Sequence, residues 1–152
     1  MANTTFAQGQ QSPAVSQARF DDKELRNYFA KHHIQAEKTA SGLYYAIKEP
    51  GTGPTAKPGQ QVSVKYLGTL LNGKKFDANV DENFNCSHPL TFVLGMHQVI
   101  PGWDEGLSYF REGTRGTLYI PSGLAYGERY VGKLIPANSI LIFEVELLDI
   151  DN

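Results

Sequence analysis

The 152-residue sequence has one cysteine, little net charge and no long apolar run. With Cys86 alone, no disulfide can form within the chain. The formal net charge is −2 and Lys and Arg are not clustered, so no nucleic-acid partner is expected, because such proteins carry a basic patch. The longest apolar runs are as short as residues 140–143, so no transmembrane segment is predicted. The length suits one domain with a buried core, plus an appendage.

Cys86 and His88 stand two positions apart, a spacing that two ligands of a metal site could have. A site with four ligands needs a second pair at matching spacing, and the sequence offers none. The favoured interpretation of Cys86 is an inert loop thiol, and neither a metal nor any other cofactor is expected.

Residues 1–18 are rich in Gln, Ser, Thr, Ala and Asn and show no apolar period. Such a segment has too little apolar surface to offset the entropy of ordering, so the sequence predicts a disordered tail. The tail lacks the basic start and apolar core of a signal peptide. It is compatible with the remnant of a removed export or lipoprotein signal.

A helix is predicted at residues 20–33, within an N-terminal helix-and-linker segment at 19–41. Asp21 or Asp22 is expected to cap its start. One apolar stripe follows three- and four-residue spacing and consists of Leu25, Tyr28, Phe29 and His32. Three partners for this stripe stay open: the main domain, the segment from Ile34, or a second copy of the chain.

From residue 42 onward, short apolar and alternating segments are separated by turns. The predicted strands are 43–47, 61–71, 90–94, 115–120 and 139–150. Asn72-Gly73 is a hairpin signal. Residues 102–110 form the one helical segment among the strands. This pattern predicts an α+β domain at 42–152, with an antiparallel sheet packed on that helix.

Five motifs occur in order between about residue 59 and residue 150. They are Val64-Lys65-Tyr66-Leu67-Gly68, Lys75-Phe76-Asp77, Val99-Ile100-Pro101-Gly102-Trp103-Asp104-Glu105-Gly106, Leu124-Ala125-Tyr126-Gly127 and Leu141-Ile142-Phe143-Glu144-Val145-Glu146-Leu147. Together they resemble the FKBP family of peptidyl-prolyl cis-trans isomerases. The helix and residues 39–45 are similar to the approach to the catalytic domain in bacterial cell-envelope members. The resemblance implies an antiparallel half-barrel wrapped around one short helix, and acceleration of Xaa-Pro bond rotation in protein folding. It also implies a periplasmic or cell-envelope location, with the cytoplasm as the alternative.

The resemblance further implies a proline-binding pocket of aromatic and apolar side chains with one carboxylate. The implied catalytic residues are Tyr66, Phe76, Asp77, Trp103, Tyr126 and Phe143. The implied substrate-binding residues are Leu90, Val99, Ile100 and Ile135. Trp103 would form the floor beneath the proline ring, and Tyr126 would offer its hydroxyl to a substrate carbonyl. Expected partners are proline-containing peptides, unfolded proteins, and the macrolides tacrolimus and rapamycin, whose pipecolinyl ring mimics proline.

The sequence departs from the small single-domain members at three places. Residues 78–89 form a longer segment that lacks the Arg pairing there with the aspartate. Leu90 replaces an aromatic rim residue, and Tyr130-Val131-Gly132 replaces the histidine-bearing part of the overhanging loop. Substrate preference and inhibitor affinity are therefore expected to differ. The alternative function is a peptide-binding chaperone or scaffold module with little catalysis, which lost pocket residues would favour.

Overall fold

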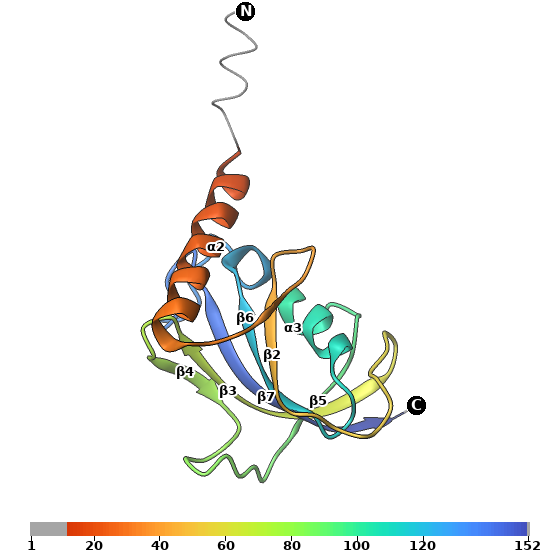
Figure 1. Ribbon diagram of the computed structural model, residues 1–152. Helices are drawn as coiled ribbons and strands as arrows, with labels where there is room; N and C mark the ends of the chain where they lie inside the picture. The colour runs from red at the N-terminus through yellow and green to blue at the C-terminus, as the bar shows by residue number, and fades with distance from the viewer. Residues whose placement is uncertain (1–11, 152) are drawn as a thin grey trace, which may run out of the picture.

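Seven antiparallel strands form one sheet in the computed structural model, which describes residues 12–151 (Figure 1). They are β1 Glu37–Lys38, β2 Tyr44–Glu49, β3 Gln61–Leu70, β4 Lys75–Ala78, β5 Leu90–Val93, β6 Arg115–Ile120 and β7 Leu141–Asp151. The order across the sheet is β1-β2-β6-β7-β3-β4, and β5 also pairs with β3. The predicted fold class, an antiparallel sheet packed on a short helix, is confirmed.

The long strand β7 buries side chains on both faces of the sheet. Successive side chains of a strand point to opposite faces. Leu141, Phe143 and Val145 accordingly enter the main core, whereas Ile142 belongs to a second apolar cluster. Each face of the sheet therefore needs its own covering element.

The main core lies between the sheet and a short helix, α3 (Pro101–Gly106), which continues as the 3₁₀ helix η1 (Leu107–Tyr109). The sheet curves around this helix (Figure 1). The helix can approach β6 closely because it has glycine at position 106. A Cβ there would lie only 2.6 Å from Cδ2 of Leu118. The segment predicted at 102–110 is thus helical, although its last turn is tightened to a 3₁₀ form.

The N-terminal helix α2 (Pro13–His32) begins seven residues before the predicted start at Phe20. The prediction of disorder is therefore wrong for residues 13–18, while residues 1–11 lie outside the described residues. The cap is Ser12, whose hydroxyl accepts a hydrogen bond from Val15 N at 3.2 Å, and not Asp21 or Asp22. A serine cap followed by proline at the first helical position starts a helix without any apolar period.

The apolar stripe of α2 packs on the sheet of its own chain, on the face opposite α3 (Figure 1). Leu25 is fully buried, and the ring of Phe29 meets two tyrosine rings edge-on. The ring centroids lie 4.9 Å apart for Tyr44 of β2 and 4.8 Å apart for Tyr119 of β6. Ile34 packs against the same cluster, so two of the three partners left open by the sequence, the main domain and the segment from Ile34, contact the stripe.

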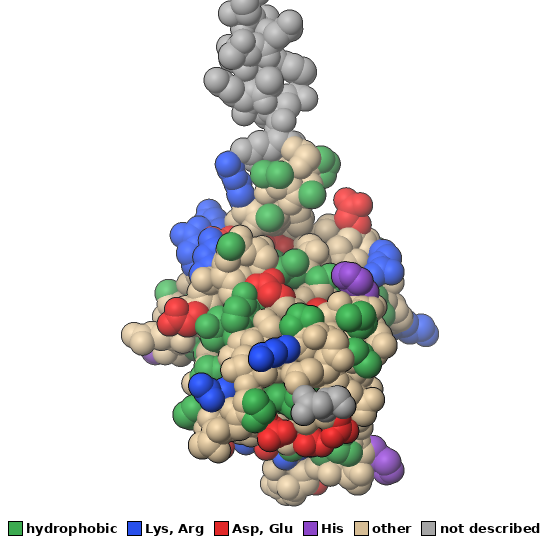
Figure 2. Space-filling model, turned by 90° about the vertical axis from the view of Figure 1, so that its right-hand side faces the viewer, with side chains coloured by type: hydrophobic (Ala, Val, Ile, Leu, Met, Phe, Trp, Pro, Cys, Tyr) green, Lys and Arg blue, Asp and Glu red, His purple; other side chains and the backbone are tan. Residues whose placement is uncertain are grey.

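The surface drawn in Figure 2 mixes charged and apolar side chains, and basic side chains lie scattered over it. Large apolar side chains exposed to solvent include Met96, Tyr109 and Tyr130. No helix within residues 12–151 has the length and apolar character needed to cross a membrane.

The packing of α2 predicts unequal effects of two identical substitutions in this helix. Phe29→Ala removes a buried ring and should lower the free energy of unfolding by about 3–5 kcal/mol. Phe20→Ala, at a position that is 58% exposed, should change it by less than about 0.5 kcal/mol. Urea unfolding measures both values. Equal effects would contradict the packing of this stripe on the sheet.

Candidate active site

Trp103 lies at the centre of a cluster of aromatic rings on the α3 side of the sheet. Its ring centroid is 5.1 Å from that of Tyr66 on β3 and 5.1 Å from that of Phe143 on β7, at interplanar angles of 78° and 85°. Phe76 on β4 meets Phe143 at 5.4 Å and 89°. Edge-to-face packing of this kind is the favoured geometry of aromatic pairs. The cluster forms a rigid apolar base.

The start of α3 places Trp103 and the residues before it. Ile100 has an extended backbone as the N-cap, and Pro101 begins the helix, where its missing N–H costs nothing. The preceding turn is held by the carboxylate of Asp104, which accepts hydrogen bonds from Gly95 N at 2.8 Å and His97 N at 3.0 Å. This local arrangement brings Val99 and Ile100 beside the Trp103 ring.

A cavity of about 180 Å³ opens above the Trp103 ring. Its lining consists of Tyr66, Asp77, Leu90, Gln98, Val99, Ile100, Trp103, Tyr126 and Phe143. Eight of the ten residues proposed from the sequence are in this set. The other two, Phe76 and Ile135, line an adjoining cavity of about 200 Å³ that shares Asp77 and Tyr126 with the first. The structure thus brings all ten residues to one region. We call the first cavity the cup.

One hydrogen bond crosses the edge of the cup. The Tyr66 hydroxyl donates to Oδ2 of the exposed Asp77 at 2.9 Å. Burial raises the pKa of Tyr66 to about 12, and the bond to Asp77 acts in the same direction. Tyr66 therefore stays a neutral donor at physiological pH, with its ring held against Trp103.

The cup offers shape, apolar surface and fixed dipoles. The indole Nε1 of Trp103 is buried and has no hydrogen-bond partner within residues 12–151. In the same part of the chain, no group of three or more His, Cys, Asp or Glu side chains could hold a metal ion.

Asn79 is not among the site residues predicted from the sequence, and it fills a gap between two strands that pair with the same edge of β3. β5 pairs with β3 as far as Val64, and β4 pairs from Leu67 onward. Between them, Tyr66 N donates to Oδ1 of Asn79 at 2.8 Å, and Nδ2 of Asn79 donates to the carbonyls of Val64 and His88 at 3.1 and 3.3 Å. The side chain replaces missing strand bonds and fixes the backbone of Tyr66. No motif indicates this role, because it depends on which strands pair.

Gln98 was also missed. It lines the cup, and its Oε1 accepts a hydrogen bond from Val93 N at 2.9 Å. Its position directly before Val99 is the only signal in the sequence that could have found it.

The long segment at 79–89 is anchored on the outer face of the sheet, opposite the cup. The Phe84 ring is buried there, 4.0 Å from the Arg115 guanidinium and 4.9 Å from Lys65 Nζ. Oδ1 of Asp81 accepts hydrogen bonds from the backbone N–H groups of Asn83 and Asn85, both at 2.9 Å. The extra length is thus a separately packed loop.

Comparison with known proteins adds to this geometry. The family model of the FKBP-type peptidyl-prolyl cis-trans isomerase matches residues 53–148, more than half of the chain. The chain belongs to this family. The resemblance seen in the five motifs is therefore confirmed for the FKBP family as a whole.

Relatives within the FKBP family differ in how much of their length this chain spans. FkpA of Aeromonas hydrophila is 46% identical over 115 residues, which cover 76% of this chain and 40% of the relative. The FK506-binding protein of Neisseria meningitidis serogroup A is 46% identical over 102 residues, or 67% of this chain and 90% of the relative. The chain thus spans less than half of one relative and most of the other.

Two solved structures share the fold. FkpA from Escherichia coli has a TM-score of 0.72 at 38% identity, covering 90% of this chain and 62% of that one. A peptidyl-prolyl cis-trans isomerase from Pseudomonas syringae has a TM-score of 0.71 at 30% identity, covering 94% of this chain and 99% of that one.

The raised pKa of Tyr66 predicts an alkaline titration. Tyr66 should lose its proton at about pH 12, compared with 10.0 for an ordinary tyrosine. Because the folded state holds this proton more tightly than the unfolded state, its contribution to stability is present below pH 10 and lost as the pH rises towards 12. Asp77→Ala should lower the pKa of Tyr66.

Nuclear magnetic resonance of ring-labelled tyrosine measures each phenol separately. Tyr44 is the internal control, because its pKa is also raised to about 12 but its partner is Asp22. The assigned hydrogen bond would be contradicted if Asp77→Ala left the pKa of Tyr66 unchanged, or if it lowered the pKa values of Tyr66 and Tyr44 equally.

Proposed function

We propose that the protein catalyses cis-trans isomerisation of Xaa-Pro peptide bonds in the cup. The observation that carries this proposal is the cavity lined by aromatic rings, which has the Trp103 ring as its floor and Tyr66, Phe143 and Tyr126 around it. We further propose that residues 42–152 form the isomerase domain and that 19–41 form the N-terminal helix and linker.

The chemistry needs no covalent step. Rotation about a peptide bond has a barrier of about 18–20 kcal/mol, because resonance must be broken. Uncatalysed Xaa-Pro exchange takes tens to hundreds of seconds as a result. In the twisted transition state the amide loses its double-bond character and much of its dipole. An apolar site that excludes water therefore favours the twisted amide over the planar one.

Each residue of the cup has a proposed role. The Trp103 ring supports the proline ring from below, and Val99 and Ile100 contact the substrate from one side. The Tyr126 hydroxyl donates a hydrogen bond to a substrate carbonyl. The exposed carboxylate of Asp77 sets the field across the cup, while its bond to the Tyr66 hydroxyl at 2.9 Å keeps that ring in place.

Proline-containing peptides and unfolded proteins are the proposed partners. Leu90 beside the cup and Leu134 beside the adjoining cavity are partly exposed, at 36% and 43%. An apolar rim of this kind favours a bulky apolar residue before the proline. The same rim would also serve a peptide-holding chaperone with little catalysis, which is the second candidate function.

Macrolide binding and location are finer proposals. The Neisseria relative is named an FK506-binding protein, which supports binding of tacrolimus, and rapamycin carries the same proline-like ring. We propose a periplasmic or cell-envelope location from the similarity to bacterial cell-envelope members. Fractionation of the producing cells would distinguish it from the cytoplasmic alternative.

The proposed activity predicts faster exchange of Xaa-Pro peptides. An acceleration on the order of 10⁴ to 10⁶ would require about 5–8 kcal/mol of transition-state stabilisation. Exchange spectroscopy on peptides with Leu or Gly before proline measures rate and preference together, and the Leu peptide should react faster. Tacrolimus added in excess should return the rate to the uncatalysed value. Tight peptide binding without acceleration would favour the chaperone function.

Two substitutions should distinguish the electrostatic contribution of Asp77 from the packing contribution of Phe143. Phe143→Ala removes a ring that is 4% exposed, so it should cost about 3–5 kcal/mol of stability together with activity. Asp77→Ala changes an exposed side chain and should alter stability by less than about 1 kcal/mol. Its effect should be a lower kcat with little change in KM, because the field acts on the transition state. Full turnover by Asp77→Ala would assign the aspartate a local structural role only.

A further inference from the structure

Asp21 of α2 forms a buried polar contact with the domain that carries the cup. Its side chain is 1% exposed, and Oδ2 accepts hydrogen bonds from both the N–H and the hydroxyl of Ser122, at 2.9 and 2.5 Å. The other oxygen accepts from Nε2 of Gln17 at 2.8 Å. Asp21 and Ser122 are 101 positions apart in the sequence. The contact therefore couples the N-terminal helix to a distant loop.

Ser122 begins the 3₁₀ helix η2 (Ser122–Leu124), which leads directly into Tyr126. The carbonyl of Ser122 accepts hydrogen bonds from Ala125 N at 3.0 Å and from Gly127 N at 2.8 Å, the two neighbours of Tyr126. The carbonyl of Gly127 in turn accepts from Asn138 N at 2.7 Å, beyond the far end of the overhanging loop. A displacement of Ser122 would therefore move the backbone on both sides of Tyr126.

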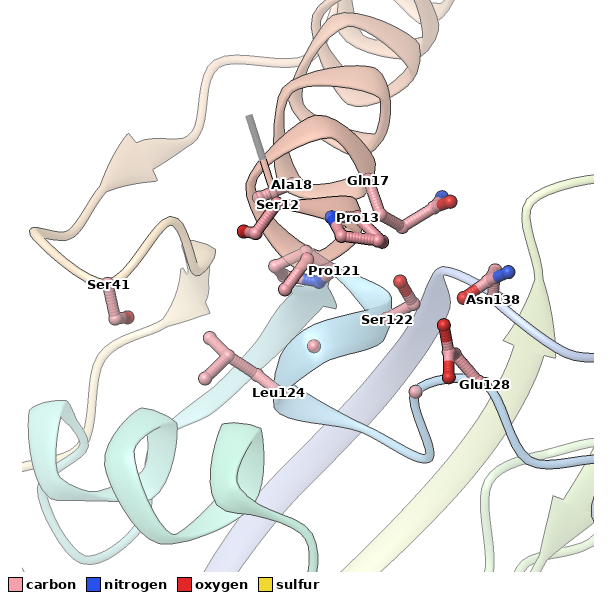
Figure 3. Close-up of a pocket in the computed structure, with 13 residues that line it drawn as sticks. Ser12, Pro13, Gln17, Ala18, Ser41, Pro121, Ser122, Leu124, Glu128 and Asn138 are labelled. Atoms are coloured by element: carbon pink, nitrogen blue, oxygen red, sulfur yellow. The ribbon is translucent and has the colours of Figure 1, made fainter. Parts of the chain in front are cut away.

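Within residues 12–151, a hollow separates the first turns of α2 from η2. A cavity of about 760 Å³ lies between the first turns of the helix and the loop, lined on one side by Pro13 and Ala18 and on the other by Ser122 and Leu124. Figure 3 shows η2 beneath the first turns of α2, with the Ser122 side chain pointing towards the helix. Leu124 of η2 packs against the main core, whereas Ser122 is tied to α2 by the two hydrogen bonds that Asp21 accepts.

We propose that Asp21 is a positioning residue for the isomerase, holding Ser122 and thereby Tyr126 over the cup. The proposal rests on the proposed function, because it takes Tyr126 to be a group that contacts the substrate. On this view α2 has a second role beyond covering the outer face of the sheet. Through Ser122 it supports the position of Tyr126 at the cup, from outside the matched family domain.

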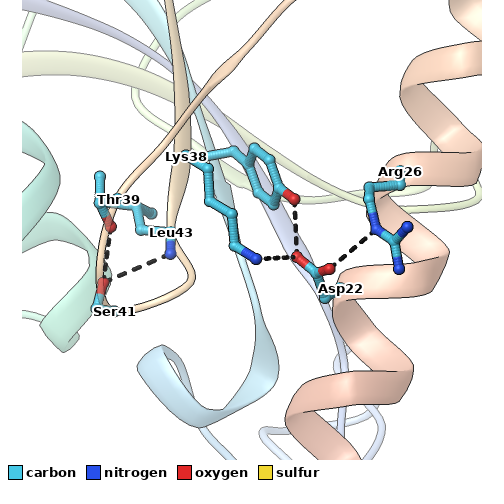
Figure 4. A network of polar contacts seen from close by, with 7 residues as sticks. Asp22, Arg26, Lys38, Thr39, Ser41 and Leu43 are labelled. Atoms are coloured by element: carbon cyan, nitrogen blue, oxygen red, sulfur yellow. Dashed lines mark hydrogen bonds and ion pairs between the residues drawn. The ribbon is translucent and has the colours of Figure 1, made fainter.

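Asp22, the next residue, provides a matched control. Its carboxylate accepts a hydrogen bond from the Tyr44 hydroxyl at 2.7 Å and lies 3.2 Å from Lys38 Nζ and 2.9 Å from Arg26 Nε (Figure 4). These contacts join the same helix to β1 and β2, away from Tyr126. Loss of Asp22 should therefore loosen the helix without moving the loop.

The experiment compares kcat/KM for an Xaa-Pro peptide at a temperature where circular dichroism shows every variant folded. Asp21→Ala should reduce kcat/KM between about 10-fold and 100-fold, the range expected for displacement of a group that contacts the substrate. Asp21→Asn should restore most of the rate, because its amide oxygen can still accept from Ser122. Asp22→Ala should leave the rate unchanged. In a Tyr126→Phe background, Asp21→Ala should cause little further loss, because both changes act on one residue.

A second measurement does not depend on activity. Hydrogen exchange of the Ala125 and Gly127 amides should become faster in Asp21→Ala and stay unchanged in Asp22→Ala. Ser122→Ala removes only the hydroxyl and should cause the same two effects at smaller size. It keeps the test possible if Asp21→Ala does not fold. The positioning role would be overturned if Asp21→Ala left hydrogen exchange at these two amides unchanged. It would also be overturned if Asp21→Ala lowered kcat/KM by the same factor in the wild-type and in the Tyr126→Phe background. If the wild-type protein has no isomerase activity but Asp21→Ala still speeds hydrogen exchange of these amides, the proposed function alone is contradicted.

Discussion

The alternation of side chains along β6 and β7 is the constraint on which both the cup and the N-terminal helix depend. Leu118 and Phe143 point to the face that holds α3, and Tyr119 and Ile142 point to the face that holds α2. A slip of one residue in the pairing of these strands would exchange the two sets of side chains. The cup would then lose Phe143, and α2 would lose its apolar partner. The wall of the cup and the docking site of the helix are therefore opposite faces of the same strands, and both are lost if the register is lost.

Two polar side chains beside the cup, Asn79 and Asp77, form hydrogen bonds with groups of Tyr66 that have no partner in the strand pairing. Asn79 bonds the backbone of Tyr66 where neither β4 nor β5 reaches it. Buried backbone groups without a partner are costly, so an amide that is both donor and acceptor suits that gap. The Tyr66 ring is thus fixed twice, through its backbone by Asn79 and through its hydroxyl by Asp77. The Tyr66 ring is therefore held in place before any ligand binds in the cup.

Much of the fold could be predicted because its signals are local. Alternating apolar residues located the main strands, and the Pro101-Gly102 break located the short helix that carries Trp103. The ten proposed site residues came from motifs of a known family, and the structure brings them around two adjoining cavities. An apolar period predicts a start of α2 that is too late, because the Ser12-Pro13 cap starts the helix without such a period. Asn79 and Gln98 were missed because hydrogen bonds to strands distant in sequence define their roles.

The order of apolar residues, their period and the turns between them are legible in the sequence, and they suffice to predict the fold class and the family. The packing of α2 on its own sheet, the place of the loop at 79–89 on the outer face and the contact of Asp21 with Ser122 become visible only in the folded chain. The physical reason is the range of the interactions. Period and capping depend on neighbours within a few residues, whereas a buried hydrogen bond between positions 21 and 122 exists only after every strand between them has found its register.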